Sequence, residues 1–286
     1  MRRIALATCA ELPDLDEDDR RLVPALATLG IDAAPVVWDD PFADWGAFDL
    51  VVVRNTWDYV GRREEFLAWA RGAGRVVNPP QVLAWSTDKR YLDELRGAGL
   101  PVVPTMFVEP GGRFPVLEGE VVVKPSESAG SRDTERHGPE SEKDAATLAS
   151  RIHRSGRTVM VQPYLRGVEG HGETALLYVG GEFSHAVHKG PMLRDGQVVR
   201  HRLFVDEEIV AREPTSAERA VGDRVMAFVS GRFGALAYAR VDLLPALGGH
   251  LVLEVELAEP SLFLATAPGA AERLARVLAD LVARSG

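Results

Sequence analysis

The fold of this chain is predicted best from residues 240–256, which read RVDLLPALGGHLVLEVE. Apolar and charged residues alternate on both sides of the Gly-Gly pair, and this alternation is typical of two half-buried strands joined by a turn. Residues two apart on a strand share a face. A hairpin that is centred near Gly248 and has no bulge therefore places Asp242 opposite Glu254 and Arg240 opposite Glu256.

Three carboxylates of this hairpin, those of Asp242, Glu254 and Glu256, then share one face, where like charges in opposite positions destabilise a sheet. Hard divalent cations take carboxylate oxygens, and Mg²⁺ is held by one or two carboxylates together with substrate phosphates. The pattern therefore predicts a Mg²⁺ site. The alternative is a solvated strand face with one Arg–Glu pair, and residues elsewhere in the chain have to separate the two.

The size and composition of the chain exclude several classes of protein. Its 286 residues exceed the usual single-core size, so two or three subdomains are expected. A formal net charge of −9 argues against a nucleic-acid binder. The apolar runs are shorter than the roughly 20 residues that span a bilayer, the N-terminus is unlike a signal peptide, and the lone Cys9 excludes a disulfide framework. We expect a cytoplasmic protein.

The first third of the chain alternates strand and helix patterns, which indicates a mostly parallel sheet covered by helices. The expected strands lie near 3–7, 34–38, 50–54 and 75–78, and the helices near 19–29 and 64–71. Neither a GxGxxG loop nor a Walker-type loop is found there. We divide the chain into an N-terminal α/β domain, a linker helix with the start of the core, a central lid subdomain and a C-terminal subdomain with the Mg²⁺ site, at 1–85, 86–120, 121–166 and 167–286.

Two lysines in the middle of the chain suit a polyphosphate. Lys124 ends a strand at 120–124 and leads into the loop 126–131, whose small residues let backbone N–H groups approach oxygens closely. Lys89 is expected near the start of a helix that begins at Ser86-Thr87, where the helix dipole offers a cation no stabilisation. A solvated surface lysine is the alternative at both positions.

The segment 159–165, VMVQPYL, has the form of a strand that enters a hinge. Pro163 has no N–H, so the backbone cannot continue a regular ladder there, and an edge with free N–H and C=O groups beside apolar residues suits an adenine ring. Glu169 and Glu173 follow, and either could accept hydrogen bonds from ribose hydroxyls. An ordinary connector with surface acids is the alternative.

The order of these motifs resembles the ATP-grasp superfamily over about residues 86–267. The matching motifs are TDK at 87–89, GLPVVPT at 99–105, VVKP at 122–125, the hinge, RVD at 240–242 and EVE at 254–256. The resemblance implies a mixed α/β and α+β architecture: an ATP-grasp fold with an N-terminal open α/β (pre-ATP-grasp) domain, a small lid subdomain and a C-terminal antiparallel-sheet subdomain. Two lobes of such a fold hold ATP between them.

The resemblance also implies roles for individual residues. ATP phosphates would contact Lys89, Lys124 and the loop residues Ser128, Gly130 and Ser131; adenine would contact Gln162, Tyr164 and Leu165; ribose would contact Glu173 or Glu169. Asp242, Glu254 and Glu256 would hold Mg²⁺, with Mn²⁺ as an alternative ion, and Arg240 would face the transferred phosphoryl group. The chain departs from the family pattern twice, with Glu256 where Asn is typical and Gln162 where an acid is typical.

Further segments resemble the cyclo-ligases of D-cycloserine biosynthesis, ATP-grasp enzymes that close O-ureido-D-serine to an isoxazolidinone ring. They include TCAELP at 8–13, RNTWDY at 54–59, FSHAVHKGP at 183–191 and EPSLFL at 259–264. The resemblance implies an acyl phosphate intermediate, antibiotic biosynthesis and a small amino-acid-like substrate, with a homodimer as an assembly to test. No nucleic-acid or membrane partner is expected.

Five side chains are candidates for the chemistry on the substrate. Arg240 is the candidate for stabilising the phosphoryl group and the oxyanion, and Lys189 for contacting a substrate carboxylate or the γ-phosphate. His185 shares a strand face with Lys189 and could serve as an acid or base, although a histidine satisfied by a neighbour is the alternative. Arg54 and Asp58 follow a strand at its carboxyl end, where open α/β sheets bind ligands, so we expect the substrate near them.

Other functions are compatible with the same motifs. An ATP-grasp ligase could join a different carboxylate to an amine. A small-molecule kinase would stop at phosphoryl transfer and release ADP with a stable phosphorylated product. A nucleotide-binding regulator would have no turnover to lose when Asp242 or Glu256 is replaced.

Overall fold

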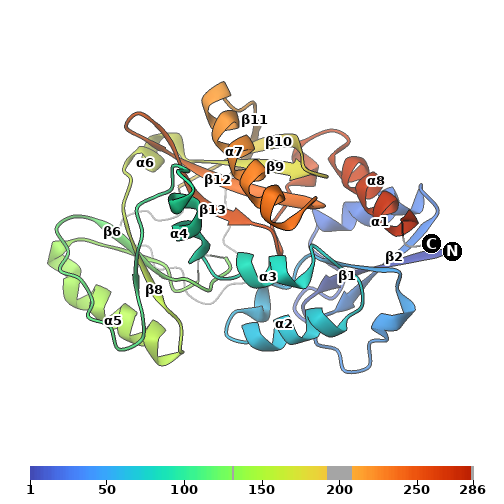
Figure 1. Ribbon diagram of the computed structural model, residues 1–286, viewed down its shortest axis with the longest axis horizontal. Coiled ribbons are helices and arrows are strands. Elements are labelled where there is room, and N and C mark those ends of the chain that lie inside the picture. Colours follow the sequence, from blue (N-terminus) through green and yellow to red (C-terminus); the bar gives the residue numbers. More distant parts are fainter. Residues whose placement is uncertain (131, 192–207, 285–286) are drawn as a thin grey trace.

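Three sheets carry the chain in the computed structural model, which describes residues 1–130, 132–191 and 208–284. Figure 1 shows them as three lobes: the N-terminal lobe, a lobe covered by α5 (Glu142–Arg154), and the lobe covered by α7 (Ser216–Phe233). The described residues contain no helix that is long and apolar enough to cross a membrane.

The N-terminal sheet is parallel throughout and has the order β2-β1-β3-β4. Its strands are β1 (Arg2–Thr8), β2 (Ile31–Val37), β3 (Leu50–Val53) and β4 (Val76–Val77). Alternate residues face opposite sides: Ile4 and Val52 face α1 (Leu22–Ala27), whereas Ala5 and Val53 face α2 (Arg63–Gly72). Because helices cover both faces, β3 is buried along its whole length and β1 from Ile4 to Thr8, as expected for a parallel sheet.

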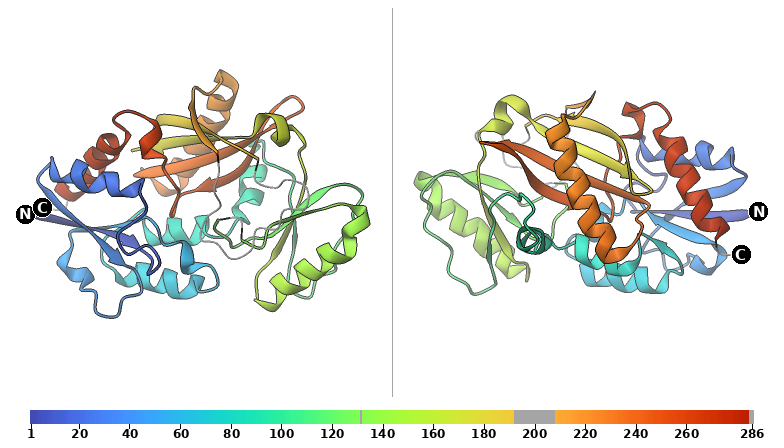
Figure 2. Two further views of the ribbon diagram at one scale, coloured as in Figure 1. Left: turned by 180° about the vertical axis from the view of Figure 1, so that it is seen from behind. Right: turned by 45° about the horizontal axis from the view of Figure 1, so that its top comes forward.

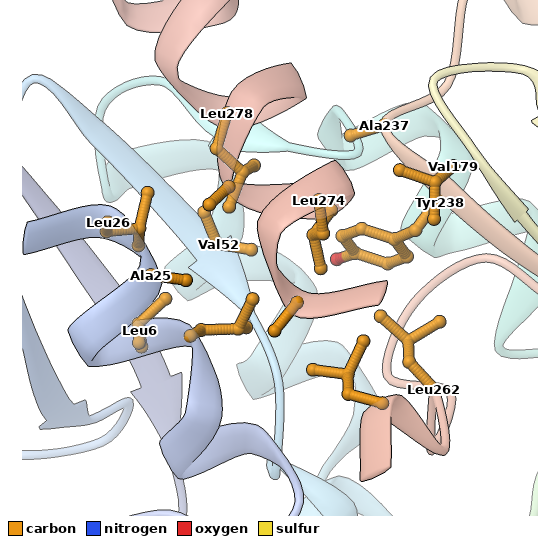
Figure 3. Close-up of a cluster of buried hydrophobic side chains, with 14 of the residues drawn as sticks. Leu6, Ala25, Leu26, Val52, Val179, Ala237, Tyr238, Leu262, Leu274 and Leu278 are labelled. Atoms are coloured by element: carbon orange, nitrogen blue, oxygen red, sulfur yellow. The ribbon is translucent and has the colours of Figure 1, made fainter. Parts of the chain in front are cut away.

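The last helix, α8 (Ala270–Ala283), returns to the N-terminal lobe and packs beside α1. Figure 1 and both views in Figure 2 show the two helices side by side. Figure 3 shows Leu274 and Leu278 of α8 between Leu26 and Tyr238. One buried cluster therefore joins the N-terminal sheet, α8 and the C-terminal sheet, which fixes the N-terminal lobe against the C-terminal sheet.

The second sheet is antiparallel and has the order β5-β8-β6-β7. Its strands are β5 (Met106–Val108), β6 (Val121–Pro125), β7 (Glu135–His137) and β8 (Val159–Pro163). One face packs against α5 through Val123, Val161 and the apolar stripe of that helix. The other face carries Val122 and Lys124 on β6 and Gln162 on β8, so this face is free to contact a ligand.

The third sheet is antiparallel and has the order β11-β10-β9-β12-β13. Its strands are β9 (Glu173–Val179), β10 (Glu182–Lys189), β11 (Ile209–Arg212), β12 (Tyr238–Ala246) and β13 (Gly249–Glu256). Helix α7 covers one face through a cluster that includes Val225 and Val229. A capping box between Thr215 and Glu218 starts this helix.

The hairpin of β12 and β13 pairs its charged residues as predicted, with Arg240 opposite Glu256 and Asp242 opposite Glu254. The expectation of no bulge is wrong. Leu243 pairs with Val252, which leaves Leu253 as an extra residue in β13. The turn is Leu247-Gly248 rather than the Gly-Gly pair, and the bulge absorbs the one-residue offset between this turn and the acids.

Lys89 lies between two helices, not at the start of one. Helix α3 (Pro80–Ser86) ends before it and α4 (Tyr91–Gly97) begins after it. Pro80 starts the first helix early because proline suits the first helical position, and the Thr87 hydroxyl donates to the Leu83 carbonyl at its end (2.8 Å). The argument from the helix dipole therefore does not apply to Lys89. The short helix α6 (Gly167–His171) follows the hinge.

Candidate functional site

A cavity of about 610 Å³ opens among the three sheets. Its walls come from the N-terminal lobe (Trp57, Tyr59), the second sheet (Lys124, Gln162) and the third sheet (Arg240). Ligand sites of this volume are common in proteins, and they occur preferentially between domains. Most of the predicted site residues line this one cavity, although they lie far apart in the sequence.

The third sheet arranges its charged residues by register. Asp242 pairs with Ala175 on one side and Glu254 on the other, and in the next row of the same face Arg240 pairs with Leu177 and Glu256. Lys189 pairs with Glu173 at the end of this face. Because side chains alternate along each strand, the acidic and cationic side chains lie on one side of the sheet, and apolar side chains pack against α7 on the other.

Arg240 connects the acids of the hairpin. Its Nε and Nη2 donate to the two Asp242 carboxylate oxygens at 2.9 and 3.0 Å, and Nη2 also donates to Glu256. Its Nη1 donates to the Ser261 carbonyl (3.2 Å). Although burial alone would lower the pKa of Arg240, Asp242 and Glu256 raise it, so the guanidinium stays charged.

The three carboxylates suit a hard divalent cation. Oxygens of Asp242, Glu254 and Glu256 lie within 4.8 Å of one another. Burial and the Glu254 carboxylate raise the pKa of Glu256 well above its usual range, although Arg240 opposes this. At Glu254 burial raises the pKa, but Lys89, a hydrogen bond with Glu256, Lys124 and Arg240 together outweigh it and hold the pKa well below its usual range. Carboxylates this close repel one another when all are ionised, and a bound Mg²⁺ would relieve that repulsion by taking their oxygens as ligands.

The lysines predicted to bind phosphate line the cavity on the side that faces these acids. Lys89 Nζ donates to the Ser128 carbonyl (3.0 Å) and lies 3.4 Å from Glu254. Lys124 is buried, and its ammonium group has no hydrogen-bond or ion-pair partner among the described residues. Burial lowers its pKa, with Lys89 acting in the same direction and Glu254 against it. A buried cation without a partner favours an anionic ligand.

The loop after Lys124 also reaches the cavity. Ser128 and Gly130 line it, and Gly130 adopts a positive φ of 59°, a conformation that suits glycine. Ser131, expected with them, lies outside the described residues.

Lys189 and Glu173 form a second charged group in the wall. Lys189 Nζ lies 3.2 Å from both Glu173 and Asp242, so it links the predicted ribose acid to the predicted Mg²⁺ acids. Of the two candidates for ribose, Glu173 lines the cavity. Glu169 instead pairs with Arg136 (2.9 Å) and is half exposed.

Gln162, Tyr164 and Leu165, the residues predicted to contact adenine, line the cavity. Gln162 Nε2 donates to the Thr105 hydroxyl (2.8 Å), which leaves its amide oxygen as the group able to accept a hydrogen bond. The Tyr164 N–H already donates to the Glu120 carbonyl (2.8 Å). Among the described residues, the hinge N–H without a partner is therefore that of Leu165. The hinge was predicted to offer free backbone groups to adenine, and among those described residues Leu165 is the one backbone donor that it has for this purpose.

Arg54, Asp58 and His185 do not line the cavity. Asp58 accepts hydrogen bonds from Trp38 (2.8 Å) and Arg62 (2.7 Å). The His185 ring bonds the Leu262 carbonyl through Nε2 and the Ser184 hydroxyl, both at 2.9 Å. A carbonyl only accepts, so Nε2 carries the proton. Burial lowers the pKa of His185, and the neutral ring supports the chain rather than exchanging protons with a ligand.

Arg54 and His185 instead help to hold one segment of backbone, residues 257–263, which follows β13. Six successive carbonyls of this segment, from Leu257 to Leu262, each accept a hydrogen bond from a side chain of another part of the chain. In order, the donors are Asn78, Tyr238, Trp57, Arg54, Arg240 and His185. Three of these donors come from the N-terminal lobe and three from the third sheet, so the two lobes together fix this wall of the cavity.

Sequence reasoning missed the functional importance of this segment. Glu259, Ser261 and Phe263 line the cavity, as do Asp16 to Asp18 at the N-terminal end of the site. A sequence signal does exist, because polar or cavity-facing residues alternate with apolar ones here: Ala258, Leu262 and Leu264 are buried in the core. The acidic residues at 14–19 show no such alternation, so no pattern in the sequence indicated that they belong to the site.

The chain is similar in sequence and in structure to known D-cycloserine synthetases. The model of the family "D-cycloserine synthetase DcsG, N-terminal domain" matches residues 4–78. The cycloserine biosynthesis protein DcsG of Streptomyces lavendulae is 36% identical over 295 residues, which cover 97% of this chain and 98% of that protein. The crystal structure of D-cycloserine synthetase DcsG superposes with a TM-score of 0.90 at 35% identity, over 98% of this chain and 99% of that chain.

More distant structures share the fold. D-alanine–D-alanine ligase from Bacillus anthracis, solved with ATP, has a TM-score of 0.67 at 13% identity and covers 99% of this chain and 98% of its own. The ATP-grasp ligase PsnB, solved with a minimal precursor, Mg and ADP, has a TM-score of 0.61 at 21% identity, with 98% of both chains covered. These structures confirm the predicted ATP-grasp architecture.

Proposed function

Because the chain belongs to the D-cycloserine synthetase family of ATP-grasp ligases, we propose that it uses ATP to close O-ureido-D-serine to D-cycloserine. The single observation that carries this proposal is 36% identity to DcsG of Streptomyces lavendulae over 97% of the chain. The ring forms between the activated carboxyl carbon and a nitrogen of the same molecule. Conversion to the free ring also releases the carbamoyl group as carbon dioxide and ammonia by addition of water.

The cavity has the parts that such a ligase needs. Lys89 and Lys124 bind the ATP phosphates, Gln162 and Leu165 bind adenine, and Glu173 binds ribose. Asp242, Glu254 and Glu256 hold Mg²⁺, which when bound neutralises charge on the phosphates. The acids at 16–18 lie at the end of the cavity built by the N-terminal lobe, where they attract the ammonium and ureido N–H groups of the substrate.

The residues of the chain act mainly by position and charge. Arg240 stabilises the phosphoryl group as it passes to the substrate carboxylate, and it then stabilises the oxyanion that forms when nitrogen attacks the acyl phosphate. Lys189 orients the substrate carboxylate. Holding nitrogen and acyl carbon of one molecule in contact replaces a second substrate and excludes water from the intermediate.

A substrate panel tests the proposed function. The enzyme is incubated with ATP, Mg²⁺ and, separately, the D and L forms of O-ureido-serine, serine and D-alanine, and ADP, free phosphate and product are measured. We expect ADP and phosphate in equal amounts with O-ureido-D-serine alone, together with D-cycloserine detected by mass spectrometry. A stable phosphorylated product would indicate a kinase, and phosphate release with an added amine would indicate intermolecular ligation.

Replacing Asp242 by Asn tests the metal site. We expect turnover to fall about 100-fold and the Mg²⁺ concentration for half-maximal rate to rise at least about tenfold, because one carboxylate is lost where Mg²⁺ depends on one or two. The measurement is ADP formation against Mg²⁺ concentration at saturating ATP. Asp223→Asn, at an exposed ion pair on α7, is the control and should match the parent. Full activity with an unchanged Mg²⁺ requirement in D242N would contradict the assignment.

A further inference from the structure

The segment 257–263 presents one carboxyl group to the cavity. Its side chains alternate between two sides: Glu259, Ser261 and Phe263 line the cavity, whereas Ala258 and Leu262 are buried in the core. The hydrogen bond from Trp57 to the Glu259 carbonyl (3.0 Å) and that from Arg54 to the next carbonyl (2.6 Å) fix the backbone at this position. The Glu259 side chain therefore has a defined place beside the ligand.

Glu259 differs from the other acids in and beside the cavity wall. Lys189 pairs with Glu173, Lys189 and Arg240 pair with Asp242, Lys89 pairs with Glu254, and Arg240 pairs with Glu256. Glu259 is only 9% exposed, and no Lys or Arg of the described residues forms an ion pair with it. A carboxylate bound to a cation is a weaker proton acceptor than a free one, so Glu259 is the one of these acids that can accept a proton without breaking an ion pair among the described residues.

The surroundings of Glu259 set its protonation near neutral pH. Burial raises the pKa of its carboxyl to about 7, and hydrogen bonding with Tyr59 and the charges of Lys89 and Arg240 lower it in part. Two other titratable groups lie near Glu259: Glu256, which lines the cavity, and Tyr238, which is buried in the core and donates its hydroxyl to the Ala258 carbonyl. A general base works best when its pKa is near the working pH. The carboxylate form appears as pH rises through about 7, so the base is present above that value.

Ring closure requires a proton acceptor, because the attacking nitrogen carries an N–H bond that must break. We propose, on the basis of the proposed function, that Glu259 accepts this proton. The nitrogen lone pair forms the C–N bond to the acyl carbon, the C–O bond to phosphate breaks, and phosphate leaves with that electron pair. The N–H proton passes to the Glu259 carboxylate. Arg240, whose Nη1 holds the Ser261 carbonyl of the same segment, brings the oxyanion site and the base into one rigid unit.

Replacing Glu259 by Gln removes the base and keeps the size of the side chain. We expect ring closure to fall at least about 100-fold in kcat. Phosphorylation of the carboxylate does not need the base, so trapping of the acyl phosphate with hydroxylamine should give hydroxamate at a rate within threefold of the parent. Glu259→Asp should recover part of the ring closure, because it restores a carboxylate. Glu272→Gln, at an exposed position in α8, is the matched control.

The dependence of the rate on pH separates a general base from a residue that only supports the structure, because replacing a supporting residue would leave the shape of the pH profile unchanged. In the parent, kcat/KM for ring closure should rise with pH through about 7, and E259Q should lose this rise. Unchanged kcat in E259Q would overturn the proposal. A raised KM with normal kcat would also overturn it, since Glu259 would then bind the substrate ammonium, as would equal loss of hydroxamate and ring. If the parent enzyme forms neither hydroxamate nor ADP with O-ureido-D-serine, the proposed function itself fails.

Discussion

Replacing Arg240 by Lys is expected to lower turnover roughly 1000-fold, with only a small change in the KM for ATP. The guanidinium bonds both Asp242 oxygens, Glu256 and the Ser261 carbonyl at once. A lysine ammonium is a compact charge on a flexible stem and cannot reproduce this planar fork. Loss of one preorganised group at a developing oxyanion costs about 10²–10³ in rate, and Arg240 is placed to serve both chemical steps.

The measurement is ADP formation at saturating ATP, Mg²⁺ and substrate, together with trapping of the acyl phosphate. Because Arg240 acts in the first step, hydroxamate formation should fall with ring closure in R240K, in contrast to E259Q. The matched control is Arg219→Lys, at an exposed pair with Asp223 on α7 (2.9 Å), which should change turnover by less than twofold. If R240K kept a third or more of the parent rate, the assignment of Arg240 as the group that stabilises the transition state would be wrong.

Replacing Arg54 by Met is expected to lower the free energy of unfolding by about 3–5 kcal/mol, or the melting temperature by roughly 10 °C. Arg54 is fully buried, its Nε donates to Asp19 (3.0 Å), and its Nη2 donates to the Pro260 carbonyl (2.6 Å). The substitution leaves a buried carboxylate without its cation and a carbonyl without its donor. Removing one partner of a buried pair is far more destabilising than removing both.

Thermal unfolding of R54M, Asp19→Asn and the double variant tests this account. The double variant should lose less stability than the sum of the two single variants, because it leaves no unpaired buried charge. Arg2→Met, at a pair with Asp49 where the arginine is 46% exposed, should cost less than about 1 kcal/mol. A melting temperature for R54M as high as that of R2M would contradict the structural role. A raised substrate KM at unchanged stability would instead favour substrate contact.

The stability deficit of R54M should also depend on pH. Burial raises the pKa of Asp19 to about 6, even with Arg54 beside it. A raised carboxyl pKa means that the folded protein binds a proton more tightly than the unfolded chain, so this group favours folding at low pH and the benefit is lost as pH rises from about 4 through about 6. Protonated Asp19 needs no cation, so we expect the deficit to be larger at pH 8 than at pH 5.

The sequence predicted the elements of the site whose signals are local. Alternation at 240–242 and 254–256 determined which residues share a face, and it gave the pairs Arg240–Glu256 and Asp242–Glu254 that the structure has. The bulge at Leu253 could not be predicted, since it depends on where the turn forms. Lys89 was predicted near the start of a helix that begins at Ser86-Thr87, but Pro80 favours an earlier helix start, and the helix that begins there ends before Lys89.

What the sequence by itself determined, then, was the set of charged strand faces and the ATP-grasp order of motifs, because a period of two residues is written into each strand. Only the tertiary structure decided that Arg54 and His185 support the backbone from behind the cavity, and that Glu259 faces into it. The hydrogen bonds that hold residues 257–263 join residues up to 206 positions apart. Contacts between such distant side chains and backbone carbonyls follow from packing the lobes together, and they leave no periodic signal in the sequence.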